Sequence, residues 1–259
     1  MRISIIGSGR VASHLALALH EQHQIIQIYA RQQHHAAIIA QQVNAQAIDD
    51  YQLLSADVDL AIIAVSDQAI ATVIQAVHQY LPDILIVHTS GSTHIQVMSH
   101  VHPRSGVLYP LQTFSYGRKI DWSNTPIFVE SIQSDDLARL QQLAQDLSQR
   151  VYCYDSEQRL SLHLAAVFAF NFSNYCYDMA KQIVDAQHVD FALLYPLILE
   201  TANKAVHTDP CEVQTGPAMR GDQNILHMHE NMLKEKNRSD FSEVYQLLSQ
   251  QILTRHQNS

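Results

Sequence analysis

The residues best suited to chemistry come at the start of the chain, in a glycine-rich turn that follows the apolar run Arg2 to Ile6. The turn has the form G-x-G-x-x-A, in which Gly7 permits a tight bend and Gly9 leaves the backbone open to a pyrophosphate. The small Ala12 lets the next helix pack closely on the strand, and the helix N-terminus offers free N–H groups to an anion. The turn predicts a dinucleotide site that comprises Gly7, Ser8, Gly9, Arg10 and Val11. The alternative is an ordinary strand–turn–helix connection with incidental glycines.

The second strand-like run, Gln24 to Tyr29, ends at Ala30 and Arg31. NAD-specific sites normally carry Asp or Glu at this strand end, where the carboxylate accepts a hydrogen bond from the ribose 2′-hydroxyl. Residues 30–33 contain no acid, whereas the Arg31 guanidinium can pair with a 2′-phosphate. Ala30 and Arg31 therefore predict NADP(H) as the cofactor. The alternative is that Arg31 is a solvated surface residue.

A continuous apolar run at residues 60–65 is typical of a buried parallel strand, and it ends at Ser66 and Asp67. In open α/β sheets, ligands bind beyond the carboxyl ends of the strands. We therefore expect Val65, Ser66 and Asp67 to lie along the ribose and pyrophosphate of the cofactor. Asp67 is also expected to cap the N-terminus of a helix over residues 68–79, and this structural role is the alternative for it.

The next buried run, residues 84–87, ends in His88, Thr89 and Ser90. These side chains are expected near the nicotinamide, so Thr89 and Ser90 are candidate cofactor ligands. His88 is a candidate catalytic residue because it stands at a strand end. A structural histidine bonded to backbone is the equal alternative for His88.

The elements that position these residues follow from the alternation of strand-like and helical runs in the first half of the chain. This alternation predicts an α/β fold, a Rossmann-like doubly wound sheet with right-handed crossovers. Beyond residue 100, we expect strands at 107–111, 126–130 and 151–154 and a helix at 135–147.

From Ser156 onward the apolar periodicity is helical, near residues 157–187, 189–206 and 239–255. The sequence thus predicts an NADP-binding Rossmann-like domain over residues 1–154 and an all-helical second domain over residues 155–259. No long Gly/Ser-rich linker separates the two halves, so we expect a cleft between domains in which ligands bind.

Composition narrows the class of partner. The formal net charge is −9 with histidines neutral, which argues against a nucleic-acid or anionic-membrane partner. The apolar helix over residues 160–172 is too short to span a bilayer, and the first strand starts too early for a signal peptide. Three cysteines without a C-x-x-C pattern suit a reducing cytoplasm, and the 16 histidines show no metal-ligand spacing.

One loop in the second half stands apart, the segment T-G-P-A-M-R-G-D at residues 215–222. Such a loop can present Thr215 and Arg220 to an anionic substrate group, with Asp222 completing the site. The alternative is a structural turn closed by an ion pair between Arg220 and Asp222.

Four segments together resemble a bacterial family that joins a Rossmann-like NADP-binding domain to a helical domain of unknown function. The architecture is similar to that of pyrroline-5-carboxylate reductases, ketopantoate reductases and β-hydroxyacid dehydrogenases. The resemblance implies that the helical domain binds an anionic small-molecule substrate and forms a homodimer. The four segments are the glycine turn, the strand end at residues 88–91, the stretch at residues 109–114 and the loop at residues 215–222.

The β-hydroxyacid dehydrogenases carry a K-x-x-x-N pair on the first long helix of the second domain, and Asn171 fits the asparagine. The lysine position is Val167, which cannot transfer a proton. His163 stands two helical turns before Asn171 and is our candidate proton donor, since a histidine pKa near 6.5 suits that role. Tyr109 occupies a position where the family of unknown function often has histidine.

These observations predict an NADP(H)-dependent oxidoreductase, a reductase or dehydrogenase that acts on a small oxo-, imino- or hydroxy-acid. The main alternative is a non-catalytic NADP(H)-binding sensor or scaffold protein, which the missing lysine favours. A Rossmann-type methyltransferase is a further alternative, but it would place an acid where Ala30 and Arg31 stand.

Overall fold

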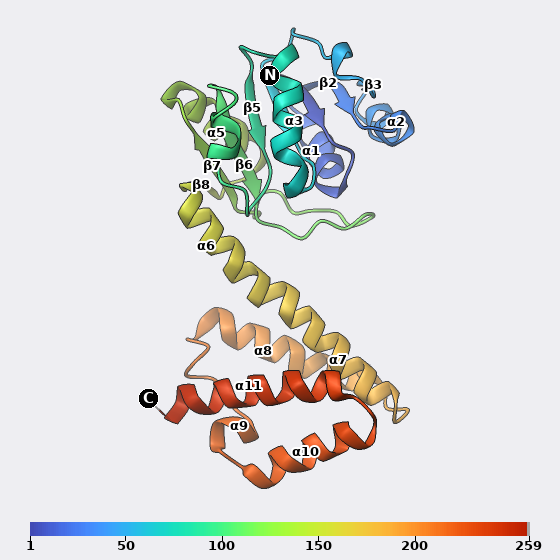
Figure 1. The fold of residues 1–259 in the computed structure, drawn as a ribbon, viewed down its shortest axis with the longest axis vertical. Helices are drawn as coiled ribbons and strands as arrows, with labels where there is room; N and C mark the ends of the chain where they lie inside the picture. Colours follow the sequence, from blue (N-terminus) through green and yellow to red (C-terminus); the bar gives the residue numbers. More distant parts are fainter. Residues whose placement is uncertain (258–259) are drawn as a thin grey trace. The chain divides into compact units, whose positions relative to one another are not determined.

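The computed structural model describes residues 1–257 and contains one eight-stranded sheet in the order β3-β2-β1-β4-β5-β6-β7-β8 (Figure 1). Neighbouring strands are parallel except for β6 and β7, which pair antiparallel. The predicted Rossmann-like doubly wound fold is therefore confirmed. The strands are β1 Arg2–Ile6, β2 Gln24–Tyr29, β3 Gln46–Ile48, β4 Leu60–Ile63, β5 Leu85–His88, β6 Ser105–Pro110, β7 Ile127–Ser131 and β8 Val151–Cys153.

Helices cover both faces of this sheet, which explains why its central strands are apolar on both sides. Ile5 of β1 belongs to the core cluster that includes buried residues of α1, α2 and α5, while Ile6 belongs to the cluster that includes α3 and α4. The two clusters alternate along β1 because successive side chains of a strand point to opposite faces. These helices are α1 Arg10–His20, α2 Gln33–Gln42, α3 Asp67–Tyr80, α4 Gln96–Ser99 and α5 Ser134–Leu147.

One local expectation is wrong. The helix α3 begins at Asp67 itself, with Ser66 as the N-cap residue, so Asp67 is not the cap. The Asp67 carboxylate instead accepts a hydrogen bond from the Ser92 hydroxyl. Asp67 thus links the start of α3 to the loop after β5.

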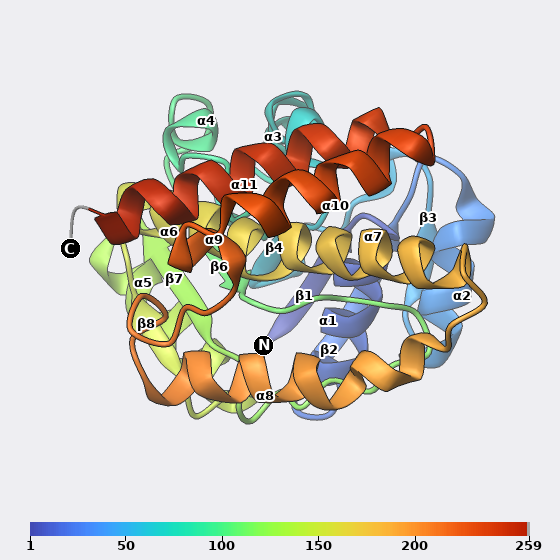
Figure 2. The ribbon, with the colours of Figure 1, turned by 90° about the horizontal axis from the view of Figure 1, so that it is seen from below.

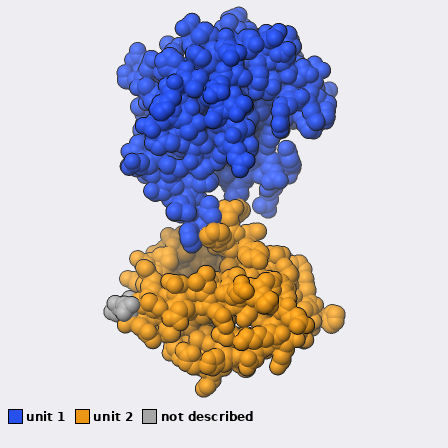
Figure 3. All heavy atoms as spheres, in the orientation of Figure 1, with its two compact units in different colours: residues 1–169 blue, residues 170–259 orange. Residues whose placement is uncertain are grey.

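The chain forms two compact units, residues 1–169 and the part from Phe170 onward (Figure 3). The helix α6, Ser156–Ala166, belongs to the first unit and α7, Ser173–Asp185, to the second. A π-helical segment, Val167–Phe172, joins them. The domain boundary that we place after residue 154 stays a prediction.

The second unit consists of helices and turns, with no strand in the part of it that the structure describes. Helix α10 packs against α11, and the short α9 contacts both (Figure 2). Its elements after α7 are the 3₁₀ turn Phe191–Leu194, α8 Tyr195–His207, α9 Pro217–Arg220, α10 Gln223–Glu235 and α11 Ser239–Gln257. Across residues 1–257, no helix has the length and apolar character needed to cross a membrane.

Candidate functional site

A cleft of about 1230 Å³ opens at the carboxyl ends of the parallel strands, entirely within the first unit. Residues that follow β1, β2, β4 and β5 line it, together with residues of β6 and α6. The structure brings together all the residues predicted to bind the cofactor. They are Gly7, Ser8, Gly9, Arg10, Val11, Ala30, Arg31, Val65, Ser66, Asp67, Thr89 and Ser90.

The two glycines of the turn play different roles. Gly7 has φ +130°, and a Cβ there would lie 2.1 Å from the carbonyl oxygen of Ala64, so only glycine fits. A Cβ at Gly9 would meet no heavy atom within 4 Å, because Gly9 faces open space at the start of α1. The first turn of α1 contains no acid, which leaves its N–H groups available to an anion. The turn therefore fits a dinucleotide pyrophosphate.

The end of β2 supplies a positive charge to the cleft. Arg31 is exposed and lines the cleft beside Tyr51, whose ring stacks on that of Tyr29 at 4.1 Å. Burial, followed by a hydrogen bond with Tyr29, raises the pKa of Tyr51. Among the described residues that line the cleft, Asp67 is the single acid, and it stands on α3 rather than at the end of β2. Sequence reasoning did not identify Tyr51, which follows β3, because β3 itself was not predicted.

His88 lies inside the protein and not on the cleft wall. Its side chain is fully buried, and its Nδ1 accepts a hydrogen bond from the Ser90 backbone N–H at 3.1 Å. Burial, and then the charge of Arg159, lowers the pKa of His88 to about 3. A neutral imidazole that accepts from the backbone favours the structural role for His88.

His163, by contrast, lines the cleft from α6. Its Nδ1 lies 3.1 Å from the hydroxyl of Tyr109, which reaches it from β6. Asn171, the other predicted catalytic residue on this run of helix, is exposed in the π-helical segment and belongs to the second unit. Asn171 is not among the residues that line the cleft within the first unit.

A buried arginine that sequence reasoning missed connects α6 to the loop after β5. Arg159 has no exposed side-chain surface and donates through Nη1 to the carbonyl oxygens of Thr93 at 2.9 Å and of Ser90 and Gly91 at 3.3 Å. Its Nη2 pairs with Glu130 at 3.0 Å. Only the tertiary structure makes Arg159 recognisable, since its partners are up to 69 residues away.

The predicted substrate residues lie in the second unit. Thr215 and Arg220 are exposed, and Asp222 accepts from the Ile225 backbone N–H at the start of α10. Gly221, with φ +67°, ends the short α9 in the left-handed conformation. No salt bridge joins Arg220 to Asp222 within the described part of the chain, so the alternative of a turn closed by that pair has no support.

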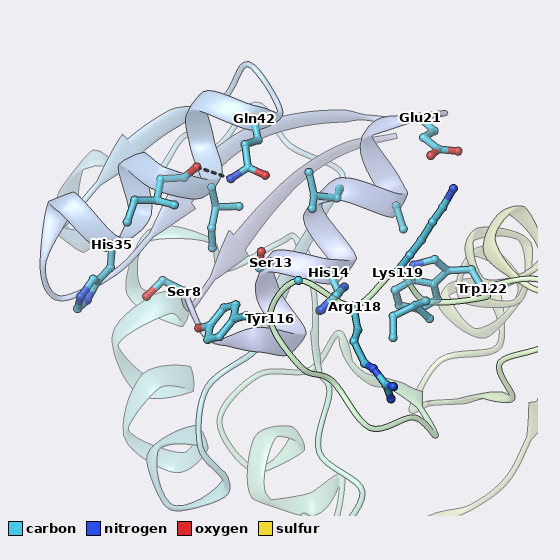
Figure 4. A pocket seen from close by; sticks show the side chains of 16 residues that line it. Ser8, Ser13, His14, Glu21, His35, Gln42, Tyr116, Arg118, Lys119 and Trp122 are labelled. Atoms are coloured by element: carbon cyan, nitrogen blue, oxygen red, sulfur yellow. Dashed lines mark hydrogen bonds between the residues drawn. The ribbon is translucent and has the colours of Figure 1, made fainter.

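A second, smaller hollow of about 600 Å³ adjoins the first, since Ser8 and Tyr116 line both (Figure 4). It lies between α1, α2 and the loop after β6. That loop packs on the start of α1, where the Arg10 guanidinium lies 5.7 Å from the Tyr116 ring centre. His14 Nε2 also forms a hydrogen bond with the carbonyl oxygen of Ser115 at 3.1 Å.

Within residues 1–257, no group of three or more His, Cys, Asp or Glu is arranged to hold a metal ion.

The fold and this cleft define a Rossmann-like NADP-binding oxidoreductase. Residues 2–91 match the family model described as NADP oxidoreductase, coenzyme F420-dependent, and residues 125–252 match a domain of unknown function, DUF2520. The structure is similar to that of a candidate NADP oxidoreductase from Bacteroides fragilis, with 38% identity, 98% of each chain covered and a TM-score of 0.90. The chain belongs to the same family as this protein.

More distant solved structures share the fold. An imine reductase from Myxococcus stipitatus, in complex with NADP⁺, gives a TM-score of 0.74 at 13% identity over 99% of each chain. A pyrroline carboxylate reductase from Plasmodium falciparum, with NADP bound, gives 0.57 at 13% identity over 98% of each chain. No curated protein matches. The Rossmann-like fold followed by a helical region is confirmed, whereas the domain division after residue 154 and the importance of the loop at residues 215–222 stay predictions.

Proposed function

We propose that this NADP oxidoreductase reduces a C=N or C=O bond, or oxidises the corresponding amine or alcohol, in a small oxo-, imino- or hydroxy-acid. The observation that carries the proposal is the single cleft lined by all the residues that the glycine turn and the neighbouring strand ends predict. When bound, NADPH supplies a hydride, and the protein must bind it, hold the substrate and provide a proton.

The cofactor preference rests on Arg31. We propose that the Arg31 guanidinium pairs with the 2′-phosphate, while the N–H groups at the start of α1 hold the pyrophosphate beside Gly9. A hydrogen bond to a charged group contributes about 1.5–3 kcal/mol, and each 1.4 kcal/mol changes an affinity about tenfold. NADPH should therefore bind about 10- to 150-fold more tightly than NADH.

The substrate class rests on two features. His163 and Tyr109 put proton-bearing groups in the cleft, and the imine and pyrroline carboxylate reductases that share the fold act on C=N bonds. We propose that Thr215 and Arg220 bind a carboxylate of the substrate, and that Asp222, which accepts from the Ile225 backbone N–H, holds their loop in place. Residues 155–259 would then form the substrate and dimerisation domain. That the substrate lies between the two domains stays a prediction.

A homodimer formed through the helical domain is supported by the surface of the second unit. Its buried apolar side chains between residues 170 and 257 are Met179, Ala218, Leu226 and Phe241, a small core for a unit of this length. Many large apolar side chains are exposed instead, and extensive exposed apolar surface marks an interface. They include Ile183, Val189, Leu193, Leu197, Leu199, Val206, Met228, Met232, Leu247 and Leu248.

The dimer proposal has its own test. Sedimentation analysis should give a dimer for the wild type, and Leu197→Glu combined with Leu199→Glu should shift it toward a monomer or prevent folding. A wild type that sediments as a monomer at micromolar concentration would exclude the dimer.

The three cysteines form no disulfide bond, which supports the expected reducing, cytoplasmic location.

The experiment that tests the function is an NADPH oxidation assay against a panel of cyclic imines, 1-pyrroline-5-carboxylate and small 2-oxo acids. Turnover of any member of the panel by the wild type, together with the loss of that turnover in Gly9→Ala, would support the oxidoreductase function. NADPH binding without turnover of any member would favour the alternative function, a non-catalytic NADP(H) sensor or scaffold, for which Val167 in place of lysine is the motivating observation.

A further inference from the structure

Tyr109 and His163 form a hydrogen-bonded pair in the wall of the cofactor cleft, although 54 residues separate them in the chain. The Tyr109 hydroxyl lies 3.1 Å from His163 Nδ1, and the two rings meet edge to face with centres 6.1 Å apart. Tyr109 is 9% exposed and lines the cleft. A buried phenol with a histidine behind it is an arrangement that can deliver a proton.

The loop after β5 is shaped around this pair. A Cβ on Gly91 would lie 2.5 Å from His163 Nδ1 and 2.7 Å from Cζ of Tyr109. The residue at this position must therefore be glycine if the two side chains are to keep their contact. The same loop carries Thr89 and Ser90, which line the cleft beside Tyr109.

We propose that Tyr109 is the catalytic residue that gives the proton to the substrate, and that His163 is the positioning residue that holds the Tyr109 hydroxyl and restores its proton. This inference rests on the reductase function proposed above. It assigns to His163 a place behind the proton donor instead of the donor role that the sequence alone favoured.

Both side chains are held in place by contacts of the elements that carry them. The helix α6 begins with a capping box between Asp155 and Gln158. One turn before His163, Arg159 fastens the helix to the carbonyl oxygens of the loop that contains Gly91. Tyr109 packs against Phe128 of β7, with ring centres 6.2 Å apart. The distance between the two residues is thus fixed by three elements that pack on one another.

Burial keeps the Tyr109 hydroxyl protonated. Burial raises the pKa of Tyr109 to about 12, while the Arg159 guanidinium on α6 acts in the opposite direction and the Asp67 carboxylate on α3 adds to the rise. Tyr154, a further titratable residue, packs against the apolar cluster that contains Tyr109. Once the Tyr109 phenol has given up its proton, a neighbouring group must replace that proton. His163, whose Nδ1 is within hydrogen-bond distance of the hydroxyl, can do so.

The proton balance is simple in the reductive direction. As the substrate carbon gains a hydride from NADPH, the π electron pair of the C=N or C=O bond moves to nitrogen or oxygen. That atom takes the proton from Tyr109 Oη, so the O–H bond breaks as the new N–H or O–H bond forms. Oη then takes the Nδ1 proton of protonated His163, which regains a proton from water.

The test compares Tyr109→Phe with Tyr245→Phe. Tyr245 pairs with Nδ1 of His229 at 2.9 Å in the second unit and does not line the cofactor cleft, so it offers the same substitution in a matched tyrosine–histidine pair. Turnover is measured with the member of the imine and oxo-acid panel that the wild type reduces fastest, and NADPH affinity is measured separately by fluorescence titration.

We expect Tyr109→Phe to lower kcat by about 10²- to 10⁴-fold, the usual range for loss of a general acid. The Kd for NADPH should change less than twofold, and Tyr245→Phe should retain wild-type turnover. The variant His163→Gln should also have a lower kcat, while its Kd for NADPH stays within twofold of the wild-type value.

A second readout does not depend on turnover. In ¹⁵N NMR spectra, the Nδ1 resonance of His163, assigned by its loss in His163→Gln, should move in Tyr109→Phe and stay in place in Tyr245→Phe. An unmoved resonance, or undiminished kcat in Tyr109→Phe, would overturn the assignment of Tyr109 and leave the reductase function standing. A wild type that turns over no member of the panel would overturn the reductase function and this inference with it.

Discussion

Replacing Gly9 with alanine should abolish tight cofactor binding without harming the fold. A Cβ at Gly9 would meet no protein atom within 4 Å, and its φ of −77° is one that alanine adopts freely. Stability should therefore change by less than about 1 kcal/mol, the scale of glycine and N-cap effects. The methyl group would instead occupy the space through which the pyrophosphate approaches the backbone.

The size of the binding defect follows from the hydrogen bonds lost. If the phosphate is pushed away from one backbone N–H group, the loss is about 1.5–3 kcal/mol, or about 10- to 150-fold in Kd. The assay is a fluorescence titration with NADPH, accompanied by a thermal melt of the protein without cofactor.

Gly7→Ala is the matched control, because it should show the opposite behaviour. Its Cβ would lie 2.1 Å from the Ala64 carbonyl oxygen at a φ of +130°. We expect a loss of more than about 2 kcal/mol in stability, or a fall in Tm of at least about 4 °C. Wild-type NADPH affinity in Gly9→Ala would refute the reasoning, because the pyrophosphate could not then lie against this turn.

Two other predictions concern the residues around the loop after β5. The pKa of His88 is lowered to about 3 in the folded protein, so its contribution to stability is complete above pH 6.5 and is lost as the pH falls. In urea unfolding, the free energy of unfolding should fall by about 2 kcal/mol through this group between pH 6.5 and pH 5. In His88→Gln, the free energy of unfolding should fall correspondingly less over the same range. Equal losses in the two proteins would contradict the assignment. Gly91→Ala should force Tyr109 and His163 apart and lower kcat at least tenfold while NADPH still binds, and full activity would show that the pair tolerates separation.

The sequence predicted the parts of the site that local chemistry determines. The glycine turn, the strand ends and Arg31 are recognisable because a short apolar run followed by small or polar residues specifies a strand and its end. These residues then meet in one cleft, since parallel strands present their carboxyl ends at the same edge of the sheet.

The parts that the sequence did not predict depend on long-range packing or on weak periodicity. The contact of Tyr109 with His163, and those of Arg159 with the loop after β5, join residues 54 to 69 positions apart. The helix α2 is short, and its first turn is polar. The helix α10, Gln223–Glu235, mixes His, Asn and Glu with its apolar residues, so its periodicity did not stand out.

We propose that this cleft binds NADP(H) and recognises the 2′-phosphate through Arg31. The most direct measurement is a calorimetric titration of the wild type and of Arg31→Ala with NADPH and with NADH. We expect NADPH to bind the wild type at least tenfold more tightly than NADH, and the Arg31→Ala affinity for NADPH to fall toward that for NADH. Equal binding of the two cofactors by the wild type, or an unchanged preference for NADPH in Arg31→Ala, would contradict it.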